Sequence, residues 1–244
     1  WIDTHCHAHL GSQHYEHAAA VVLAATQQSD WPLVRDYRGT VAARAFGVHP
    51  WFADTATKDY LEQLEAVLRN DPAALVGEIG LDGQYESDIF ESQLALAARL
   101  RRPTTVHCVG AYGHMRRVFE DAPRLPPALA MHSYGGSFEF GRDLRNLARA
   151  KNCEVFFGFS ATINGRPNRR RKQLDLLAAL PADAILLETD LEDASLVDAH
   201  LRTVLHDLVA PARGWTPDHA LERCHHNALA FLSSSSSSRR TDVY

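Results

Sequence analysis

Six residues of types that commonly bind metal ions each follow a short apolar run in this chain. They are, in chain order, His5, His7, Glu78, His107, His132 and Asp190. One histidine at such a position carries little information, but side chains delivered by successive strands converge when those strands close into a barrel. Imidazoles and carboxylates gathered in this way can bind one or two divalent cations, such as Mg²⁺, Mn²⁺ or Zn²⁺. The sequence therefore predicts a metal-dependent hydrolase.

The first three of these residues have spacings that suit metal binding. His5 and His7 lie in the segment IDTHCH at 2–7. Residues two apart on an extended strand point to the same side, so both imidazoles can reach one cation. Glu78 lies inside the apolar segment GEIGLD at 77–82, where a carboxylate is costly to bury without a partner. A cation would be that partner, and two carboxylate oxygens could contact two ions; an ion pair with an arginine is the alternative.

The last three predicted ligands, His107, His132 and Asp190, follow further apolar runs. His107 and His132 would each, taken alone, more often be a core histidine than a ligand, but together they indicate a second metal ion. Asp190 closely follows the last predicted strand, where it can bind the first ion and accept a proton from the attacking water. Metal coordination brings the pKa of such a water close to neutrality. We therefore predict Asp190 and Glu78 as catalytic residues.

The elements that must position these residues alternate along the chain, which predicts a parallel sheet with right-handed crossovers. The predicted strands span 1–4, 20–25, 41–47, 74–79, 104–107, 128–132, 154–159 and 184–187. The predicted helices include 60–69, 90–101, 141–150, 173–180 and 196–209, and a closing helix over 217–232 packs on the outside or bottom. A doubly wound sheet usually has a glycine-rich loop after its first strand, whereas histidines end this one. We predict an α/β fold, a single-domain TIM-like (β/α)8 barrel with its metal site at the carboxyl-terminal face.

Length, charge and cysteine content further restrict the class of protein. The 244 residues suit one barrel over 1–232, followed by a serine-rich flexible tail over 233–244. The net charge of −5 argues against broad electrostatic adhesion to nucleic acid. No apolar run is long enough to cross a membrane. The four cysteines have no disulfide or zinc spacing, so we expect a reduced intracellular location, cytoplasmic and/or nuclear, and favour a monomer.

The ligands and their surrounding segments resemble the TatD family of metal-dependent deoxyribonucleases, within the amidohydrolase-like barrels. The matching segments are IDTHCH at 2–7, GVHP at 47–50, GEIGLD at 77–82, VHC at 106–108, MHSYGG at 131–136 and ETD at 188–190. The resemblance covers nearly the whole chain. It implies a TIM-like barrel with two divalent ions that cleaves phosphodiester bonds in DNA, at single strands or ends and without sequence specificity. Position by position, it implies one ion on His5, His7 and Asp190, another on His107 and His132, and Glu78 bridging them.

Two departures from the family pattern bear on the substrate. Family members often have an arginine two residues after the fifth-strand histidine, where a guanidinium can clamp phosphate, but this chain has Val109. The usual Ala-Pro-Tyr after ETD is replaced by Leu191, Glu192 and Asp193, whose two acids would repel an anion. Both changes resemble the divergent fungal branch that is similar to the Cut9-interacting protein.

Other residues could bind the substrate. His49 matches a family histidine that contacts substrate phosphate, although it could instead be a turn residue fixed by the proline that follows. Arg166, Arg169 and Arg170 follow the seventh predicted strand on the metal face and could hold a nucleic-acid backbone, or form only a solvated helix turn.

Two other functions stay open. The missing arginine favours a hydrolase of a non-nucleic ester, lactone or amide, although related barrels with such substrates usually bridge their metals through a modified lysine, and no lysine ends a strand here. The other is a partner-binding scaffold with a vestigial site, which the complete ligand set opposes.

Overall fold

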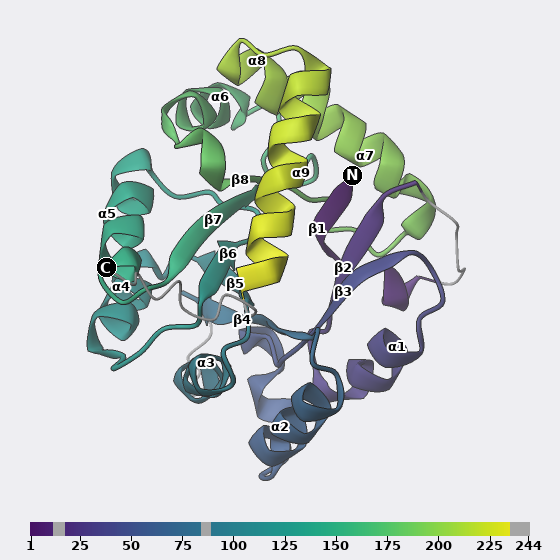
Figure 1. Cartoon of the computed structure of the whole chain (residues 1–244), viewed down its shortest axis with the longest axis vertical. Coiled ribbons are helices and arrows are strands. Elements are labelled where there is room, and N and C mark those ends of the chain that lie inside the picture. Colours follow the sequence, from purple (N-terminus) through teal and green to yellow (C-terminus); the bar gives the residue numbers. More distant parts are fainter. Residues whose placement is uncertain (12–17, 84–88, 235–244) are drawn as a thin grey trace, which may run out of the picture.

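The eight predicted strands form one parallel barrel, and helices surround it (Figure 1). The computed structural model describes residues 1–11, 18–83 and 89–234. The strands are β1 (Ile2–Cys6), β2 (Ala20–Ala24), β3 (Val41–Phe46), β4 (Leu75–Asp82), β5 (Thr104–Val109), β6 (Ala128–Met131), β7 (Glu154–Phe159) and β8 (Ile185–Leu187). Each strand pairs in parallel with the next along the chain. The predicted TIM-like (β/α)8 barrel is confirmed.

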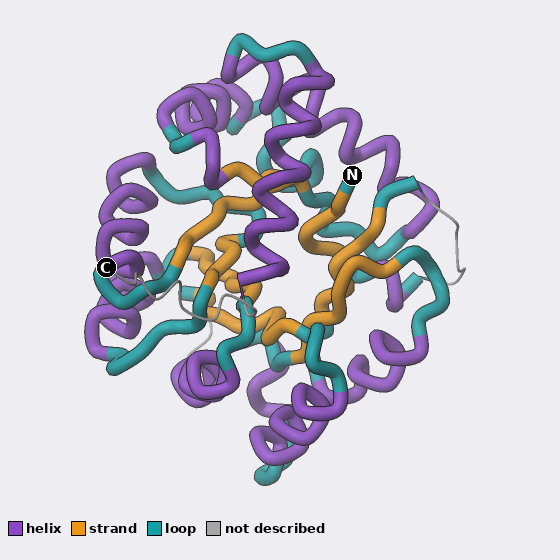
Figure 2. Tube along the Cα trace, in the orientation of Figure 1, coloured by secondary structure: helices purple, strands orange, loops and turns teal. Residues whose placement is uncertain are grey.

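Helices form the outer layer around the strands (Figure 2). They are α1 (Trp31–Asp36), α2 (Tyr60–Asn70), α3 (Ile89–Leu100), α4 (Tyr112–Asp121), α5 (Phe138–Arg149), α6 (Arg170–Ala179), α7 (Val197–Val204), α8 (Ala210–Arg213) and α9 (Pro217–Ser233). Short helical turns are η1 (Ala8–Leu10), η2 (Gln28–Asp30), η3 (Pro50–Thr55), η4 (Ala182–Ala184), η5 (Ala194–Leu196) and η6 (Leu205–Val209). The predicted helix 196–209 is divided, because η6 has the wider turns of a π-helix. The helices predicted from the sequence do not include α4 or the two short helices α1 and α8, which are six and four residues long.

The barrel closes where β8 meets β1, and this seam brings two predicted ligands together. The Thr4 hydroxyl donates a hydrogen bond to the Leu187 carbonyl at 3.0 Å. The Asp190 backbone N–H donates to the carbonyl of His5 at 2.9 Å. The first and last strands therefore hold His5 and Asp190 at one end of the barrel.

The opposite end of the barrel is apolar and is covered by α9, which crosses the strands in Figure 1. Ala228 and Phe231 of α9 pack into a buried cluster formed by the strands. The Asn227 side chain donates to the carbonyls of Ala182 and Ile185 at 2.8 and 2.9 Å, which fixes α9 to the start of β8. The closing helix thus lies at the bottom of the barrel.

The end of the chain continues that helix slightly further than expected. The helix α9 includes Ser233, the first residue of the predicted tail, and the rest of that tail from residue 235 onward lies outside the described residues. Among the helices of the described chain, none is both long and apolar enough to span a membrane.

Candidate metal centre

The six predicted ligands converge at the carboxyl-terminal face of the barrel. In chain order, β1 carries His5 and precedes His7, β4 carries Glu78, β5 carries His107, β6 precedes His132 and β8 precedes Asp190. Their donor atoms fall into groups of three within 4.8 Å of one another, and the third group also includes His49. The groups are His5, Glu78 and His132; His5, His7 and Asp190; and His49, Glu78 and His107.

Glu78 lies at the centre, and its two oxygens face different imidazoles. Oε2 lies 3.2 Å from Nε2 of His5 and 3.4 Å from Nε2 of His7. Oε1 lies 2.7 Å from Nε2 of His132 and 3.2 Å from Nδ1 of His107. The side chain is buried. A carboxylate placed in this way can be shared between two ions.

Asp190 completes the group on the Oε2 side of Glu78. Its Oδ1 lies 3.7 Å from Nε2 of His5 and 3.5 Å from Nε2 of His7. Asp190 has φ +59°, in the left-handed region that aspartate adopts more readily than most residues. Non-glycine residues in this region often occur at functional sites, where the surrounding structure holds them.

Contacts outside the cluster orient the ligand rings. His7 Nδ1 donates to the carbonyl of Ala24 at 2.8 Å, which leaves Nε2 with its lone pair toward the cluster. His5 Nδ1 lies 2.9 Å from the Thr105 hydroxyl. Both first-strand histidines therefore present Nε2 to the carboxylates, the geometry that a metal ligand needs.

Asp3 supports the cluster from below, and sequence reasoning missed it. Its carboxylate accepts from the His5 backbone N–H at 3.1 Å and from the Thr189 N–H and hydroxyl at 3.0 and 2.6 Å. Burial raises the pKa of Asp3 to about 7, and these hydrogen bonds oppose the shift. Asp3 thus joins the segment that carries His5 to the one that carries Asp190.

The charges and unsatisfied atoms of the cluster fit divalent cations. Burial alone would lower the pKa of His132, but the carboxylates of Glu78, Asp190 and Glu188 together outweigh it and raise that pKa to about 10. Burial also opposes ionisation of Glu78, yet the imidazoles hold its pKa well below the ordinary value. Within the described structure, Nε2 of His5 and Nδ1 of His132 are buried and make no hydrogen bond. Imidazole and carboxylate donors of this kind are typical ligands of divalent metal ions in proteins.

His49, which was expected to contact substrate, lies in direct contact with the ligand cluster. It is buried, and its Nε2 lies 3.4 Å from Oε1 of Glu78. Its Nδ1 accepts from the Trp51 backbone N–H at 3.1 Å, so a neutral ring carries its proton on Nε2. From there it can donate to Glu78 or to a phosphate oxygen.

Asp82 and Trp51 orient the imidazole of His107. The Trp51 indole N–H donates to Oδ2 of Asp82 at 2.9 Å, and the same oxygen lies 3.4 Å from Nε2 of His107. This contact directs Nδ1 of His107 toward Glu78. The sequence signal for Asp82 was its place at the end of the GEIGLD segment.

Glu188 is a further buried acid that sequence reasoning did not single out. It accepts from the Ser133 backbone N–H and from the Ser133 hydroxyl, and lies 3.9 Å from Nδ1 of His132. Burial raises the pKa of Glu188 to about 8. A Cβ at Gly158 would collide with its carboxylate. Glu188 therefore fixes the turn that presents His132, and its signal was the acid that begins ETD.

Two cavities open onto the cluster, and Trp51, His107, His132 and Asp190 line both. The smaller one, about 260 Å³, is also lined by Leu10, Phe52 and Glu192 among others. The larger one, about 530 Å³, also includes Val109, Tyr112, Arg166, Arg169 and Lys172. Two of the three arginines predicted to bind substrate thus reach the site.

Arg170 does not line either cavity, in contrast to that expectation. Its guanidinium donates to the carbonyl of Asp207 at 3.1 Å, in η6. Helical residues one apart differ in direction by about 100°, so Arg169 and Arg170 at the start of α6 face different surroundings.

The acidic segment after ETD is only partly directed at the site. The Leu191 carbonyl accepts from the His7 N–H at 2.7 Å. Asp193 caps η5 by accepting from the Ser195 N–H at 2.9 Å. Glu192 alone of the two acids lines a cavity of the centre, so the repulsion expected there comes from one carboxylate.

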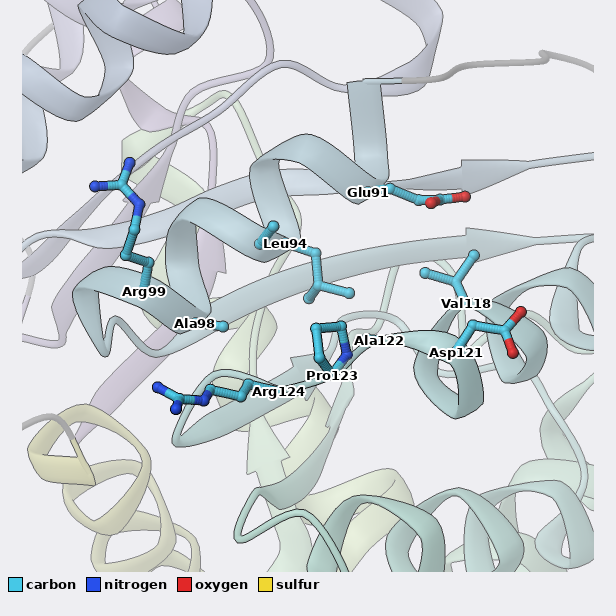
Figure 3. Close-up of a pocket in the computed structure, with 10 residues that line it drawn as sticks. Glu91, Leu94, Ala98, Arg99, Val118, Asp121, Ala122, Pro123 and Arg124 are labelled. Atoms are coloured by element: carbon cyan, nitrogen blue, oxygen red, sulfur yellow. The ribbon is translucent and has the colours of Figure 1, made fainter.

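A third cavity, about 470 Å³, lies on the outer wall between α3 and α4 (Figure 3). Leu94 and Val118 contribute apolar surface, and Glu91 and Arg124 lie toward opposite ends of the view. None of the described residues that line it is a predicted ligand or substrate-binding residue.

The parallel barrel and the buried histidine–carboxylate cluster at its carboxyl-terminal face together define a metal-dependent hydrolase. The family model described as "TatD related DNase" matches residues 2–233, and the chain belongs to this TatD family.

Individual relatives extend this result. The chain is 24% identical to the Cut9-interacting protein scn1 of Schizosaccharomyces pombe, over 95% of this chain and 98% of that protein. It is 30% identical to the uncharacterized metal-dependent hydrolase YjjV of Escherichia coli, over 80% and 81% of the two chains. The crystal structure of YjjV has a TM-score of 0.70 at 23% identity, covering 95% of this chain and 97% of that one, which supports the fold.

Proposed function

We propose that the chain is a metal-dependent nuclease that hydrolyses phosphodiester bonds in DNA, at single-stranded segments or ends. The observation that carries this proposal is Glu78, whose two oxygens face two separate sets of imidazoles beneath open cavities. Such a pair of sites suits in-line displacement at phosphorus.

The names of two relatives support a nucleic-acid substrate. The 3'-5' ssDNA/RNA exonuclease TatD of Pantoea ananatis is 31% identical over 59% of this chain and 55% of that protein. The human 3'-5' RNA nuclease TATDN2 is 30% identical over 60% of this chain and 19% of that protein. Because both nucleic acids occur in these names, RNA belongs in the same tests as DNA.

Each side chain has a role in the proposed reaction. Two divalent cations (Mg²⁺, Mn²⁺ or Zn²⁺) would supply positive charge that offsets the phosphate and makes an attacking water more acidic. Asp190 accepts the proton of that water at its carboxylate, and His49 Nε2–H can donate to a phosphate oxygen. The proposed ligands are His5, His7 and Asp190 for one ion, His107 and His132 for the other, and Glu78 for both.

The first experiment is hydrolysis of end-labelled single-stranded DNA and RNA with each of the three metal ions, and with a chelator control. Metal-dependent shortening of the labelled strand is the expected result. Glu78→Gln or Asp190→Asn should abolish it in folded protein, as judged by circular dichroism. Full activity in either variant would contradict the mechanism, and cleavage of small esters without any effect on nucleic acid would favour the other hydrolase function.

We also infer that residues 1–232 act as one catalytic unit and that a monomer is sufficient, because one chain supplies all six ligands. The four cysteines, Cys6, Cys108, Cys153 and Cys224, are buried and unpaired, which supports a reducing intracellular location, cytoplasmic and/or nuclear. The molar mass of the active fraction, measured by light scattering after size-exclusion chromatography, tests whether the enzyme is a monomer.

A further inference from the structure

The larger cavity of the centre carries positive charge beside the proposed metal ligands. Arg166, Arg169 and Lys172 line it together with His107 and Asp190. The three basic residues precede or begin α6, so the loop after β7 delivers them to the same face as the ligands. A bound anion at the metal centre would therefore have cations on this side of it.

These three charges have no carboxylate partner among the described residues. Arg166 Nε donates to the Thr162 carbonyl at 2.8 Å, and Lys172 Nζ donates to the Gly135 carbonyl at 3.3 Å. Their neighbour Arg171 differs, because it points outward, 94% exposed, with Asp175 at 3.7 Å. Uncompensated cations that line a cavity favour an anionic ligand there.

Val109 ends β5, at the position where the resemblance to the TatD family leads us to expect an arginine, and it lies on the same cavity. It is 54% exposed and lines the space that Arg166 and Arg169 also line. The positive charge that is missing from the end of β5 is thus supplied from the start of α6. The metal face therefore has a basic wall although Val109 is uncharged.

The smaller cavity has the opposite character. No lysine or arginine occurs among the described residues that line it. Leu10, Trp51 and Phe52 give it apolar and aromatic surface, and Glu192 adds a negative charge. A polyanion that crosses the centre would therefore extend through the basic cavity, and the aromatic side could receive a base.

We propose that the basic cavity binds the phosphate next to the scissile one in single-stranded DNA, with Arg166, Arg169 and Lys172 in place of the missing arginine. This inference rests on the proposed nuclease function. It predicts that the chain prefers an oligonucleotide to a small phosphodiester, because only the oligonucleotide has a second phosphate.

The test compares a double variant, Arg166→Gln with Arg169→Gln, against the matched control Arg171→Gln. Each protein is assayed with labelled single-stranded DNA and RNA octamers and with bis(4-nitrophenyl) phosphate, which has no second phosphate. For the double variant, KM for the octamers should rise about tenfold or more with kcat nearly unchanged, while the small diester is hydrolysed as before. The slope of log KM against log salt concentration should also decrease by about 0.7 for each phosphate that the variant no longer neutralises. Arg171→Gln should behave as the parent protein.

Binding gives a readout that does not need turnover. Fluorescence anisotropy of labelled DNA and RNA octamers, measured with chelator present, should show weaker DNA binding by the double variant than by Arg171→Gln. Equal weakening in both variants, or none in either, would overturn the inference, and preferential weakening with RNA alone would assign the cavity to RNA. If the parent protein hydrolyses no phosphodiester at all, the proposed function fails, whereas hydrolysis without any effect of the double variant refutes only this inference.

Discussion

The two ends of the barrel use the same eight strands for opposite purposes. At the amino-terminal end, aliphatic and aromatic side chains fill the interior, and the rings of Phe156 and Phe231 lie 5.8 Å apart. At the carboxyl-terminal end, the rings of buried His5 and partly buried His132 stack at 4.2 Å beside Glu78. Burial stabilises the first set by about 25 cal/mol for each Å² of apolar surface, whereas it destabilises isolated charges in the second.

This difference shows where stability and function are located. The apolar core at the amino-terminal end stabilises the barrel. The carboxyl-terminal end can therefore hold buried charged side chains that repel or desolvate one another, as is typical of this barrel type. Asp3 and Glu188, both buried, fix the top by hydrogen bonds to its turns. We therefore expect changes at the bottom to lower stability without altering activity, and changes to the proposed metal ligands at the top to have their largest effect on activity.

The largest effect is expected for Glu78→Gln at the top. The amide keeps the size but loses the charge that both groups of imidazoles face, so kcat should fall on the order of 10³-fold or more, given that one preorganised electrostatic contact can be worth 10²–10³. Metal content by mass spectrometry should fall with it, while the circular dichroism spectrum persists. Glu62→Gln on exposed α2 is the control, and retention of both ions by Glu78→Gln would contradict the shared-carboxylate geometry.

Next in size is Phe231→Ala at the bottom. Phe231 is fully buried in α9, so its truncation should lower the free energy of unfolding by about 3–5 kcal/mol, measured by urea denaturation. Activity per folded molecule should stay unchanged. Leu229→Ala on the same helix, where the side chain is 46% exposed, should have little effect on either quantity. A loss of kcat in folded Phe231→Ala protein would show that the two ends are coupled.

Metal removal should lower the stability of the fold by an intermediate amount, and this loss should depend on the ligands at the top but not on the apolar bottom. A ligand at 100 times its Kd stabilises the native state by about 2.7 kcal/mol, so chelation should lower Tm without unfolding the barrel. The decrease should be absent in Glu78→Gln and unchanged in Phe231→Ala, as measured by differential scanning calorimetry. An equal decrease in all three proteins would mean that the ions bind elsewhere.

The sequence predicted the ligands because each lies at the end of an apolar run, and the barrel brings such ends together. It placed the ends of two strands too early, since β4 continues to Asp82 and β5 to Val109, beyond the expected ends at 79 and 107. The apolar pattern stops before these strand ends, where the residues are polar or exposed. The backbone is nevertheless extended there and pairs Asp82 with Val109.

Contacts between distant segments could not be predicted in this way. The link between Asp3 and Thr189 joins residues 186 positions apart, and no local pattern indicates it. The direction of Arg170 depends on where α6 begins, since a shift of one residue rotates each side chain by about 100°. Residue types therefore predicted the chemistry, whereas three-dimensional packing decides which neighbours orient it.

The smallest effect is expected at Asp30, a buried carboxylate on the metal side that hydrogen bonds satisfy without an ion. Oδ2 accepts from the Thr26 N–H and hydroxyl at 3.0 and 2.7 Å. Burial would raise the pKa of Asp30, but His9, at 3.9 Å, and Thr26 outweigh it and hold the pKa at about 2. Because this is below the ordinary value of 3.8, the ionised carboxylate stabilises the fold above about pH 4, and this contribution is lost as pH falls from about 4 to 2.

Asp30→Asn should therefore lower the free energy of unfolding at neutral pH on the order of 1–2 kcal/mol and flatten its decline between pH 4 and 2, as measured by urea denaturation. Asp36→Asn, which removes an exposed carboxylate paired with Arg35, should produce no measurable change. Chelator should not alter the Asp30 effect, because hydrogen bonds rather than cations offset this burial. If it did, Asp30 would belong to the metal centre, and the division between ion-stabilised and hydrogen-bonded acids on this face would fail.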